Sequence, residues 1–400
     1  MRILVIADYL PYPLIGGDRI RIYNTLRRAS QKHEISLVAF LEKASDIDGV
    51  SHLKKFCAHV DTVDIEERSR LDKLLGMFAY LISGKPPELN ILKSSKLTQK
   101  IRKLTSAKDF DIVQIEHAHM ALYLEALAPD QSPKSLLMFH NFTSQQYKRV
   151  SHVEKRWSKK IRSKFNSIAM GYWEPRYAER FDYSTTVSEE DRQLLLNENS
   201  RLQVEVIPNG VDVQKYQPLS SESISPSLLF LGNMGYPPNI DAALYFCKEI
   251  FHLIRQEDKK AELWIVGRDP SPEILELDND NVHITGRVDD VIPYYKKTSV
   301  CVVPLRAGGG TRLKILEAMA LGRPVISTRI GCEGLDVIDN ENIIIADTPA
   351  QFAQKTTQVL HDHELYEHLS KNGRKLVETR YSWDPITDKL MALYEKMTTG

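Results

Sequence analysis

The residues with the clearest chemical signal lie in the run Pro304–Ala320, which reads PLRAGGGTRLKILEAMA. Three consecutive glycines follow an apolar strand-like segment and precede a segment with helical spacing. Free backbone N–H groups and the dipole at a helix start bind anions. Arg312 and Lys314 add cations where the dipole disfavours them, and Glu317 is within reach of a polar ligand or of Lys314. The run predicts an anion site; the alternative is a glycine hinge with surface cations.

A second glycine loop, PLIGGDR at residues 13–19, follows the first apolar segment of the chain. Arg19 and Arg21 lie at the start of the helical segment after it. Neither loop has the Gly-Lys-Ser/Thr of a P-loop or the glycine spacing of a dinucleotide fingerprint. Two glycine loops, each followed by arginines, indicate a phosphate held between two domains.

The elements that position these loops alternate between strands and helices, which is typical of parallel sheets covered on both faces. The first half of the chain predicts strands at 3–7, 33–40, 60–65, 112–115 and 135–139, and helices at 20–29 and 95–104. The second half predicts strands at 227–231, 261–266, 282–285, 300–305, 324–328 and 343–346, and helices at 239–256 and 312–321. The fold class is therefore α/β, with two tandem Rossmann-like domains.

Glycines end four strands of the second domain, at Gly232, Gly267, Gly286 and Gly331. Ligands bind beyond the carboxyl ends of strands in open α/β sheets, so these glycines favour a ligand crevice over simple turns. A Ser- and Pro-rich stretch at 215–226 separates the domains, and an amphipathic helix is predicted at 385–397.

The composition fits a globular enzyme, with 42% hydrophobic and 26% charged residues and no net charge. No apolar run reaches the length of a membrane span; the nearest, Leu74–Ile82, has the length of a core helix. The N-terminus does not read as a signal peptide. The four scattered cysteines predict buried thiols in a reducing cytoplasm.

Charge is distributed unevenly along the chain. Residues 1–200 hold 31 Lys and Arg against 25 Asp and Glu, whereas residues 201–400 hold 22 against 28. The segment Lys148–Lys164 contains eight cationic residues against Glu154, with Trp157 among them. Such a segment is typical of a solvated helix face, and the alternative is contact with an anionic membrane.

Five segments, in this order, resemble the retaining glycosyltransferase family 4, a group with the GT-B fold. They are Gly16-Gly17, the run VIPNGVD at 206–212, LGNM at 231–234, the pair VGR at 266–268 and TGRV at 285–288, and KILEAMA at 314–320. The resemblance covers nearly the whole chain. It implies domains at 1–215 and 216–376, with sheets facing across a cleft, and a C-terminal helix at 377–400 that returns to the first domain.

The resemblance also implies the roles of individual residues. Glu317 would bind the ribose hydroxyls of a nucleoside-diphosphate sugar, and the loop after Gly309 would bind its sugar and diphosphate. The expected donor site comprises Gly16, Gly17, Asn209, Gly232, Asn233, Arg268, Arg287, Val288, Gly309, Gly310, Thr311, Leu313 and Glu317. No cofactor or metal is expected, because cations and helix dipoles can stabilise the leaving diphosphate.

The sequence departs from the family pattern at three positions. Gly309 replaces a second glutamate, and the stretch 232–239 lacks an Arg and a Lys that usually bind the diphosphate. Glu116 stands where a histidine is usual, beside His117 and His119, the latter expected on the opposite face if the strand continues. Arg312 and Lys314 are expected to act on the phosphate, and Glu116 or His117 at the acceptor. Arg19 and His140 are expected on the acceptor side.

The resemblance therefore predicts sugar transfer, with retention, from a nucleotide sugar such as a UDP-sugar to a hydroxyl. Bacterial polysaccharide or glycoconjugate assembly is the expected setting, in the cytoplasm or at the inner face of the membrane. The acceptor would be a glycan, a lipid-linked glycan or a small molecule, and no nucleic acid is expected. The alternatives are a nucleotide-sugar epimerase of the same fold and a binding or regulatory protein with a decayed site.

Overall fold

The computed structural model describes residues 1–42, 44–65, 93–154, 156–219, 226–310 and 312–399. Their contacts divide the chain into two compact units. Unit 1 comprises Met1–Gln145, Phe165–Pro208 and Trp383–Gly400, and unit 2 comprises Gln146–Lys164 and Asn209–Ser382. The domain boundaries expected from the sequence, at 215/216 and 376/377, remain predictions. The helix expected at Leu74–Ile82 lies outside the described residues.

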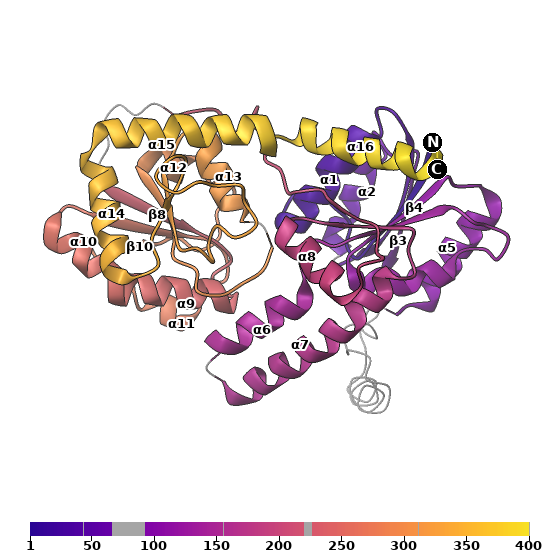
Figure 1. Cartoon of the computed structure of the whole chain (residues 1–400), viewed down its shortest axis with the longest axis horizontal. Coiled ribbons are helices and arrows are strands. Elements are labelled where there is room, and N and C mark those ends of the chain that lie inside the picture. Colours follow the sequence, from indigo (N-terminus) through magenta and orange to yellow (C-terminus); the bar gives the residue numbers. More distant parts are fainter. Residues whose placement is uncertain (43, 66–92, 155, 220–225, 311, 400) are drawn as a thin grey trace. The chain divides into compact units, whose positions relative to one another are not determined.

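Unit 1 is built on a parallel sheet of seven strands in the order β3-β2-β1-β4-β5-β6-β7 (Figure 1). The five strands expected from the sequence are present, and β6 and β7 are additions that correct that count. Both are short, and β6 reads YSTT, so neither carries an apolar run. The strands are β1 (Arg2–Ala7), β2 (Glu34–Leu41), β3 (His59–Asp64), β4 (Ile112–Glu116), β5 (Lys134–Met138), β6 (Tyr183–Thr186) and β7 (Val204–Val206).

Helices cover both faces of this sheet and enclose two hydrophobic cores. The C-terminal helix α16 packs against α1, and its Trp383 and Leu390 belong to the same core as Ile3 of β1. The predicted return of this helix to the first domain is thereby confirmed. The helical elements are α1 (Gly17–Ala29), η1 (Ala44–Ile47), α2 (Asp48–Leu53), α5 (Ser95–Ala107), η2 (Ala118–Ala126), α6 (Thr143–Val153), α7 (Trp157–Ala178), α8 (Glu189–Glu198) and α16 (Trp383–Thr399).

Unit 2 contains the six strands that the sequence predicted, and they form a parallel sheet in the order β10-β9-β8-β11-β12-β13. The near-continuous apolar character of its strands fits a sheet that is buried on both faces. The strands are β8 (Ser227–Leu231), β9 (Glu262–Val266), β10 (Val282–Ile284), β11 (Val300–Val303), β12 (Val325–Ser327) and β13 (Ile344–Ile345).

The helix expected at 239–256 is present as three consecutive pieces, the middle one a π-helix. The other expected helix of this unit, at 312–321, is α13. The helical elements are α9 (Pro237–Tyr245), η3 (Phe246–Phe251), α10 (His252–Glu257), α11 (Pro272–Leu275), α12 (Ile292–Lys297), α13 (Leu313–Ala320), α14 (Pro349–His361), α15 (His363–Leu376) and η4 (Val377–Tyr381).

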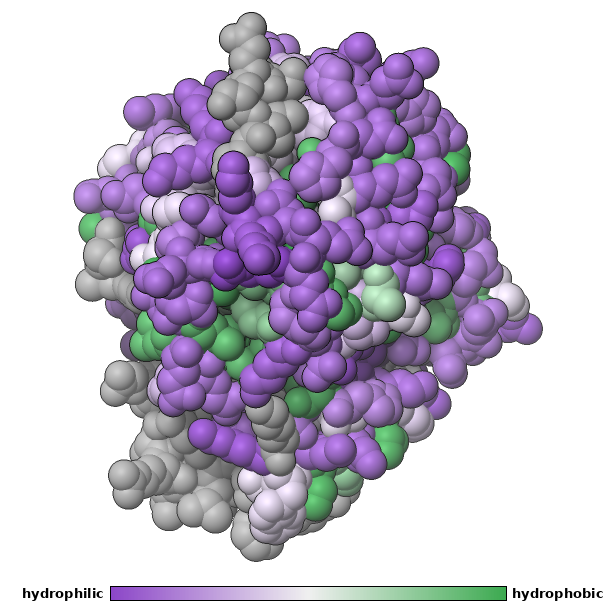
Figure 2. Space-filling model, turned by 90° about the vertical axis from the view of Figure 1, so that its left-hand side faces the viewer, coloured by the Kyte–Doolittle hydropathy of each residue, from purple (hydrophilic) through white to green (hydrophobic). Residues whose placement is uncertain are grey.

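Hydrophilic side chains dominate the face drawn in Figure 2, and apolar side chains show between them across its middle. Among the described residues, no helix combines the length and the hydropathy that crossing a membrane requires. Cys57, Cys301 and Cys332 are buried, Cys247 is half-buried, and all four are free thiols.

Gly267, at the end of β9, lies against the backbone at the end of β8. A Cβ added to Gly267 would lie 1.6 Å from the carbonyl oxygen of Gly232. We expect Gly267→Ala to lower the free energy of unfolding by about 3 kcal/mol, the upper end of overpacking costs. Gly286→Ala is the control, because Gly286 also has positive φ but has no atom within 4 Å of the added Cβ. Equal midpoints of the two variants in urea would contradict this packing.

Candidate active site

The strand order reverses between β1 and β4 in unit 1, and between β8 and β11 in unit 2. Ligands of open α/β sheets bind at such switch points, beyond the carboxyl ends of the strands. In unit 1 the residues at this point are Asp8, just after β1, and His117, just after β4. In unit 2 they are Gly232, just after β8, and the glycine loop beyond β11.

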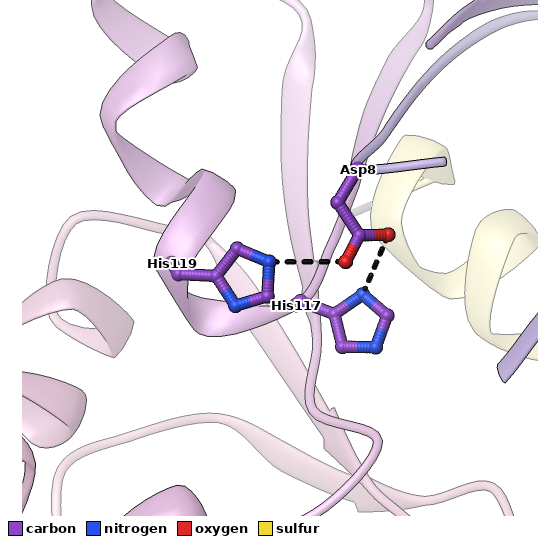
Figure 3. A group of neighbouring side chains, drawn as sticks. All are labelled: Asp8, His117 and His119. Carbon is purple, nitrogen blue, oxygen red and sulfur yellow. Dashed lines mark hydrogen bonds and ion pairs between the residues drawn. The ribbon is translucent and has the colours of Figure 1, made fainter. Parts of the chain in front are cut away.

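Asp8 in unit 1 lies between two imidazoles (Figure 3). His117 Nδ1 lies 3.2 Å from Asp8 Oδ1, and His119 Nε2 lies 3.0 Å from Asp8 Oδ2. Burial raises the pKa of Asp8, but His117 and His119 outweigh burial and hold that pKa well below its usual range. Asp8 is therefore an ionised carboxylate that orients both rings.

His117 has a backbone conformation that is rare for a residue with a side chain, with φ 71° and ψ 141°. Such strain concentrates at functional sites and persists only where the surroundings impose it. The strand β4 ends at Glu116, and the chain turns at His117 into the 3₁₀ helix η2. The strand that the expectation for His119 assumed ends before this residue, and a continuing strand would in any case place His117 and His119 on the same face. The two rings stack, with centroids 5.1 Å apart.

Glu116 and His140 form a buried pair behind His117. His140 Nε2 lies 2.6 Å from Glu116 Oε2, and His140 Nδ1 lies 3.6 Å from Asp18 Oδ1. Burial lowers the pKa of His140, but hydrogen bonds and charge from Asp18 and Glu116 outweigh it and raise that pKa. His117 and His140 have ring centroids 3.9 Å apart. The structure thus brings together Glu116, His117 and His140, which the sequence singled out separately.

A chain of buried polar groups holds Glu116 from behind. Gln114 Nε2 donates to Glu116 Oε1, and the hydroxyl of Tyr394 in α16 donates to Gln114 Oε1. The C-terminal helix therefore braces the site through two hydrogen bonds. Sequence reasoning missed Gln114 and Tyr394, which lie 280 positions apart and carry no local motif.

We expect Glu116→Gln to lower the pKa of His140, because the amide keeps the shape of the carboxylate but removes its charge. NMR titration of the histidine rings measures this shift. Glu42→Gln is the control, since Glu42 is engaged by Arg19 instead. An unchanged His140 pKa in Glu116→Gln would contradict the pairing.

The same side chains have the composition of a metal site. Asp8, His117 and His119 have ligand atoms within 4.8 Å of one another, as do Asp18, His117 and His140. Two histidines and a carboxylate suit zinc or iron(II). In this structure Asp8 instead pairs with His117 and His119. The absence of a metal remains a prediction from the sequence.

Lys314 in unit 2 lies one residue into α13 and faces the end of β8. Its Nζ lies 3.3 Å from Asn239 Oδ1 and 4.7 Å from the centre of the Phe230 ring. Burial lowers the pKa of Lys314 to about 7, and Arg312 contributes in the same direction. Lys314 can therefore gain a proton when an anion approaches. No carboxylate is recorded in an ion pair with Lys314 among the described residues.

Glu317 lies one helical turn after Lys314. Its Oε1 accepts a hydrogen bond of 3.2 Å from the hydroxyl of Tyr216. Burial raises the pKa of Glu317 to about 7, although Tyr216, Lys215 and Lys314 lower it in part. The carboxyl group is poised between its neutral and ionised forms and suits an exchange of hydrogen bonds with ligand hydroxyls.

The glycine loop precedes α13, with positive φ at Gly308 and Gly310. The guanidinium of Arg312 folds back on this loop and donates to the carbonyls of Gly309 and Gly310, the latter at 2.7 Å. The sequence predicted Arg312 as a phosphate ligand; in this structure it supports the loop. Leu313 packs on the core of unit 2, and Thr311 lies outside the described residues.

The remaining expected site residues are spread over both units. Gly232 and Asn233 follow β8, where Asn233 Oδ1 accepts from the backbone N–H of Gly235. Arg19 is ion-paired with Glu42 and Asp46, which engages its guanidinium on the protein itself. Four more lie as follows: Asn209 is buried, Arg268 is close to Asp269, Arg287 is exposed, and Val288 packs on the core. Gly16 and Gly17 lie at the start of α1.

Two side chains that sequence reasoning missed adjoin the glycine loop within unit 2. Arg149 donates to the carbonyl of Gly308 at 2.8 Å and is ion-paired with Glu333. Gln146 donates to the hydroxyl of Tyr236 at 2.9 Å, and its Cβ lies 3.4 Å from a Cβ built on Gly309. Gln146 therefore occupies the space beside the position that lacks the second glutamate. The only sequence signal here was the positive charge of Lys148–Lys164.

Comparison with known proteins matches both halves of the chain. The family model described as Glycosyltransferase Family 4 matches residues 15–215, and that described as Glycosyl transferases group 1 matches residues 225–362. The capsular polysaccharide biosynthesis glycosyltransferase CapM of Staphylococcus aureus is 27% identical over 201 residues, 46% of this chain and 52% of CapM.

Solved structures share the fold over the full length. A sucrose-phosphate synthase from Thermosynechococcus elongatus aligns with a TM-score of 0.72 at 18% identity, covering 100% of both chains. HepE of Anabaena, solved in complex with UDP and glucose, aligns with a TM-score of 0.67 at 13% identity, covering 99% of this chain and 100% of HepE. With a family model matching half of the sequence, the chain belongs to glycosyltransferase family 4, whose members have the GT-B fold and transfer sugars with retention and without a metal.

Proposed function

We propose that this enzyme transfers a sugar from a UDP-sugar to a hydroxyl acceptor in the assembly of a bacterial polysaccharide or glycoconjugate. The observation that carries the proposal is the pair Lys314 and Glu317 on α13. Burial brings the pKa of each to about 7, so that each can change its charge when a donor binds. The relatives support the donor and the setting, since HepE was solved with UDP and CapM acts in capsular polysaccharide biosynthesis.

The donor binds to unit 2 in this proposal. Glu317 accepts hydrogen bonds from the ribose hydroxyls and releases Tyr216 as it does so. Lys314, with the N–H groups of the glycine loop, faces the diphosphate. Negative charge grows on the diphosphate as the glycosidic bond breaks, and a preorganised cation in a water-poor site stabilises that charge strongly. Gln146 takes the place of the second glutamate of other family members and contacts the donor sugar.

The acceptor binds to unit 1, at the switch point that holds Asp8 and His117. Asp8 fixes the His117 ring, and the charged pair of Glu116 and His140 lies directly behind it. His117 donates or accepts a hydrogen bond at the reacting hydroxyl. In front-face transfer with retention, the departing diphosphate itself takes the acceptor proton, so His117 positions the hydroxyl.

The affinity for UDP is expected to be highest near pH 7 and to fall at both higher and lower pH. Above this value the free enzyme holds Lys314 as a neutral amine, since its pKa is lowered to about 7, and binding of the diphosphate then requires proton uptake. Below it Glu317 holds a proton, since its pKa is raised to about 7, and the carboxyl group loses acceptor capacity. Calorimetry from about pH 5.5 to about pH 9 should show that the affinity for UDP is highest near neutrality. A flat profile would contradict the pKa values.

A transfer assay tests the proposed activity. The enzyme is incubated with UDP-glucose, with and without a glycolipid extract, and the release of UDP is followed. We expect release to depend on the extract and the product to retain the anomeric configuration. An isomerised sugar nucleotide without any acceptor would favour the epimerase. Binding of UDP without turnover on any extract would favour the decayed binding protein.

A further inference from the structure

The helix α7 carries a row of large apolar side chains that are exposed to solvent. Trp157 is 76% exposed, Ile161 57%, Phe165 46%, Ile168 75% and Tyr172 53%. These are five of the eleven exposed large hydrophobic residues recorded among the described residues. Scattered apolar residues on a surface need no explanation, but a contiguous row marks an interaction site.

The spacing places all five side chains on one side of the helix. They follow one another at intervals of four, four, three and four residues. At about 100° per residue they fall within an arc of about 80°, and at 1.5 Å per residue they span about 22 Å. The row is thus a continuous stripe along most of α7, which we call the α7 stripe.

The opposite side of α7 is fixed to the protein. Ser163, Asn166, Met170, Glu174 and Tyr177 are buried there. The carboxylate of Glu174 accepts hydrogen bonds from the backbone N–H groups of Thr143 and Ser144, at 2.7 and 3.2 Å. The hydroxyl of Ser167 donates to the carbonyl of Ser144, close to the start of α6. Figure 1 shows the course of α7. The helix presents its stripe outward because its other face is already packed.

Cations flank the α7 stripe on both sides. By the same helical geometry, Lys160 and Lys164 lie along one border and Arg162 and Arg176 along the other. The guanidinium of Arg176 lies 3.4 Å from the centre of the Tyr172 ring. The acidic residue within α7 is Glu174, which is buried. The exposed side of the helix is therefore apolar in the middle and positively charged at its edges.

We propose that α7 binds the surface of an anionic membrane and that the α7 stripe enters the boundary between headgroups and acyl chains. An amphipathic helix with Trp and other large apolar residues on one face and Lys and Arg beside it binds in this way. Aromatic rings such as Trp157 and Tyr172 favour the headgroup level. Lys and Arg long enough to reach past the stripe bind anionic headgroups. The flanking cations favour anionic lipid over an apolar face of a second copy of this chain.

The inference deepens the proposed function and rests on it for the acceptor, since an enzyme held at a membrane has ready access to a lipid-linked hydroxyl. Membrane binding itself is independent of catalysis. A vesicle assay tests membrane binding, and an assay of nucleotide binding tests the proposed function, so each can fail without the other.

The test is co-sedimentation with vesicles of phosphatidylcholine containing about 30% phosphatidylglycerol, in parallel with vesicles of phosphatidylcholine alone. We expect binding to the anionic vesicles that falls steeply with added NaCl. The double variant Ile161→Ser, Ile168→Ser is expected to bind at least about tenfold more weakly. The variant Lys160→Gln, Lys164→Gln is expected to lose most of the preference for anionic lipid. Both variants should bind UDP as the wild type does.

Leu275→Ser, Ile338→Ser is the matched control, because these two side chains are 52% and 55% exposed but lie outside α7. Binding equal to that of the wild type is expected. Absence of wild-type binding, or equal binding to both kinds of vesicle, would overturn the proposal. So would a dimer in sedimentation equilibrium that dissociates in Ile161→Ser, Ile168→Ser, since the α7 stripe would then cover a second copy. Vesicle binding with no affinity for UDP would instead overturn the proposed function.

Discussion

Lys314→Met is expected to lower kcat/KM for the sugar nucleotide by about 100-fold or more, the usual loss when a preorganised charge-stabilising group is removed. Methionine keeps the length of the buried stem, which lies on the Phe230 ring, and removes the ammonium group. In the proposed mechanism, the charge that develops on the leaving diphosphate then loses the cation that stabilises it. Steady-state kinetics of UDP release, with donor as the varied substrate, measure the loss.

Lys371→Met is the control, because the Lys371 side chain is 77% exposed on α15 and is ion-paired with Glu367. Arg312→Met tests the other cation of the motif. Because Arg312 supports the carbonyls of the glycine loop in this structure, we expect a smaller loss than for Lys314. Kinetics of Lys314→Met within twofold of the wild type would remove Lys314 from the reaction.

Glu317→Ala is expected to weaken both donor binding and turnover by at least about tenfold, since hydrogen bonds to a charged group contribute about 1.5–3 kcal/mol. The variant removes the carboxylate that we propose as the acceptor for the ribose hydroxyls, and it leaves the Tyr216 hydroxyl without its partner. Calorimetric titration with UDP measures the affinity directly. Tyr216→Phe should reduce the affinity for UDP far less, because in the proposed mechanism the hydrogen bond from Tyr216 to Glu317 is replaced when the donor binds.

Glu276→Ala, at an exposed position after α11, is the control for a lost carboxylate in unit 2. Unchanged affinity and turnover in Glu317→Ala would exclude Glu317 from the site. Loss of affinity for UDP but not for inorganic diphosphate would place Glu317 at the nucleoside, as proposed.

The sequence predicted the two sheets and the approximate position of each apolar strand, because buried parallel strands consist of near-continuous runs of branched apolar residues. It also singled out Lys314 and Glu317, because the glycines before them indicate that a ligand can approach the backbone closely. It missed β6 because YSTT is polar, although Thr185 and Thr186 are fully buried. A short strand bordered by others needs little apolar character of its own.

The parts of the site that escaped the sequence depend on contacts between distant positions. Tyr394 reaches Gln114 from the C-terminal helix, and Arg149 reaches Gly308 from a segment 159 positions earlier. No spacing rule links such residues. The expectation for His119 failed for a different reason: β4 ends at Glu116, and even a continuing strand would place positions 117 and 119 on the same face.

The most direct test of the central claim, that unit 2 is a working nucleotide-sugar site, is calorimetric titration of the wild-type protein with UDP, GDP and ADP. The proposed site predicts tight binding of UDP, with the other two diphosphates clearly weaker. Absence of binding to all three, in protein that is well folded by circular dichroism, would contradict it. That result would mean that, with Gly309 and the uncharged stretch around Asn233, the protein no longer binds a nucleotide-sugar donor.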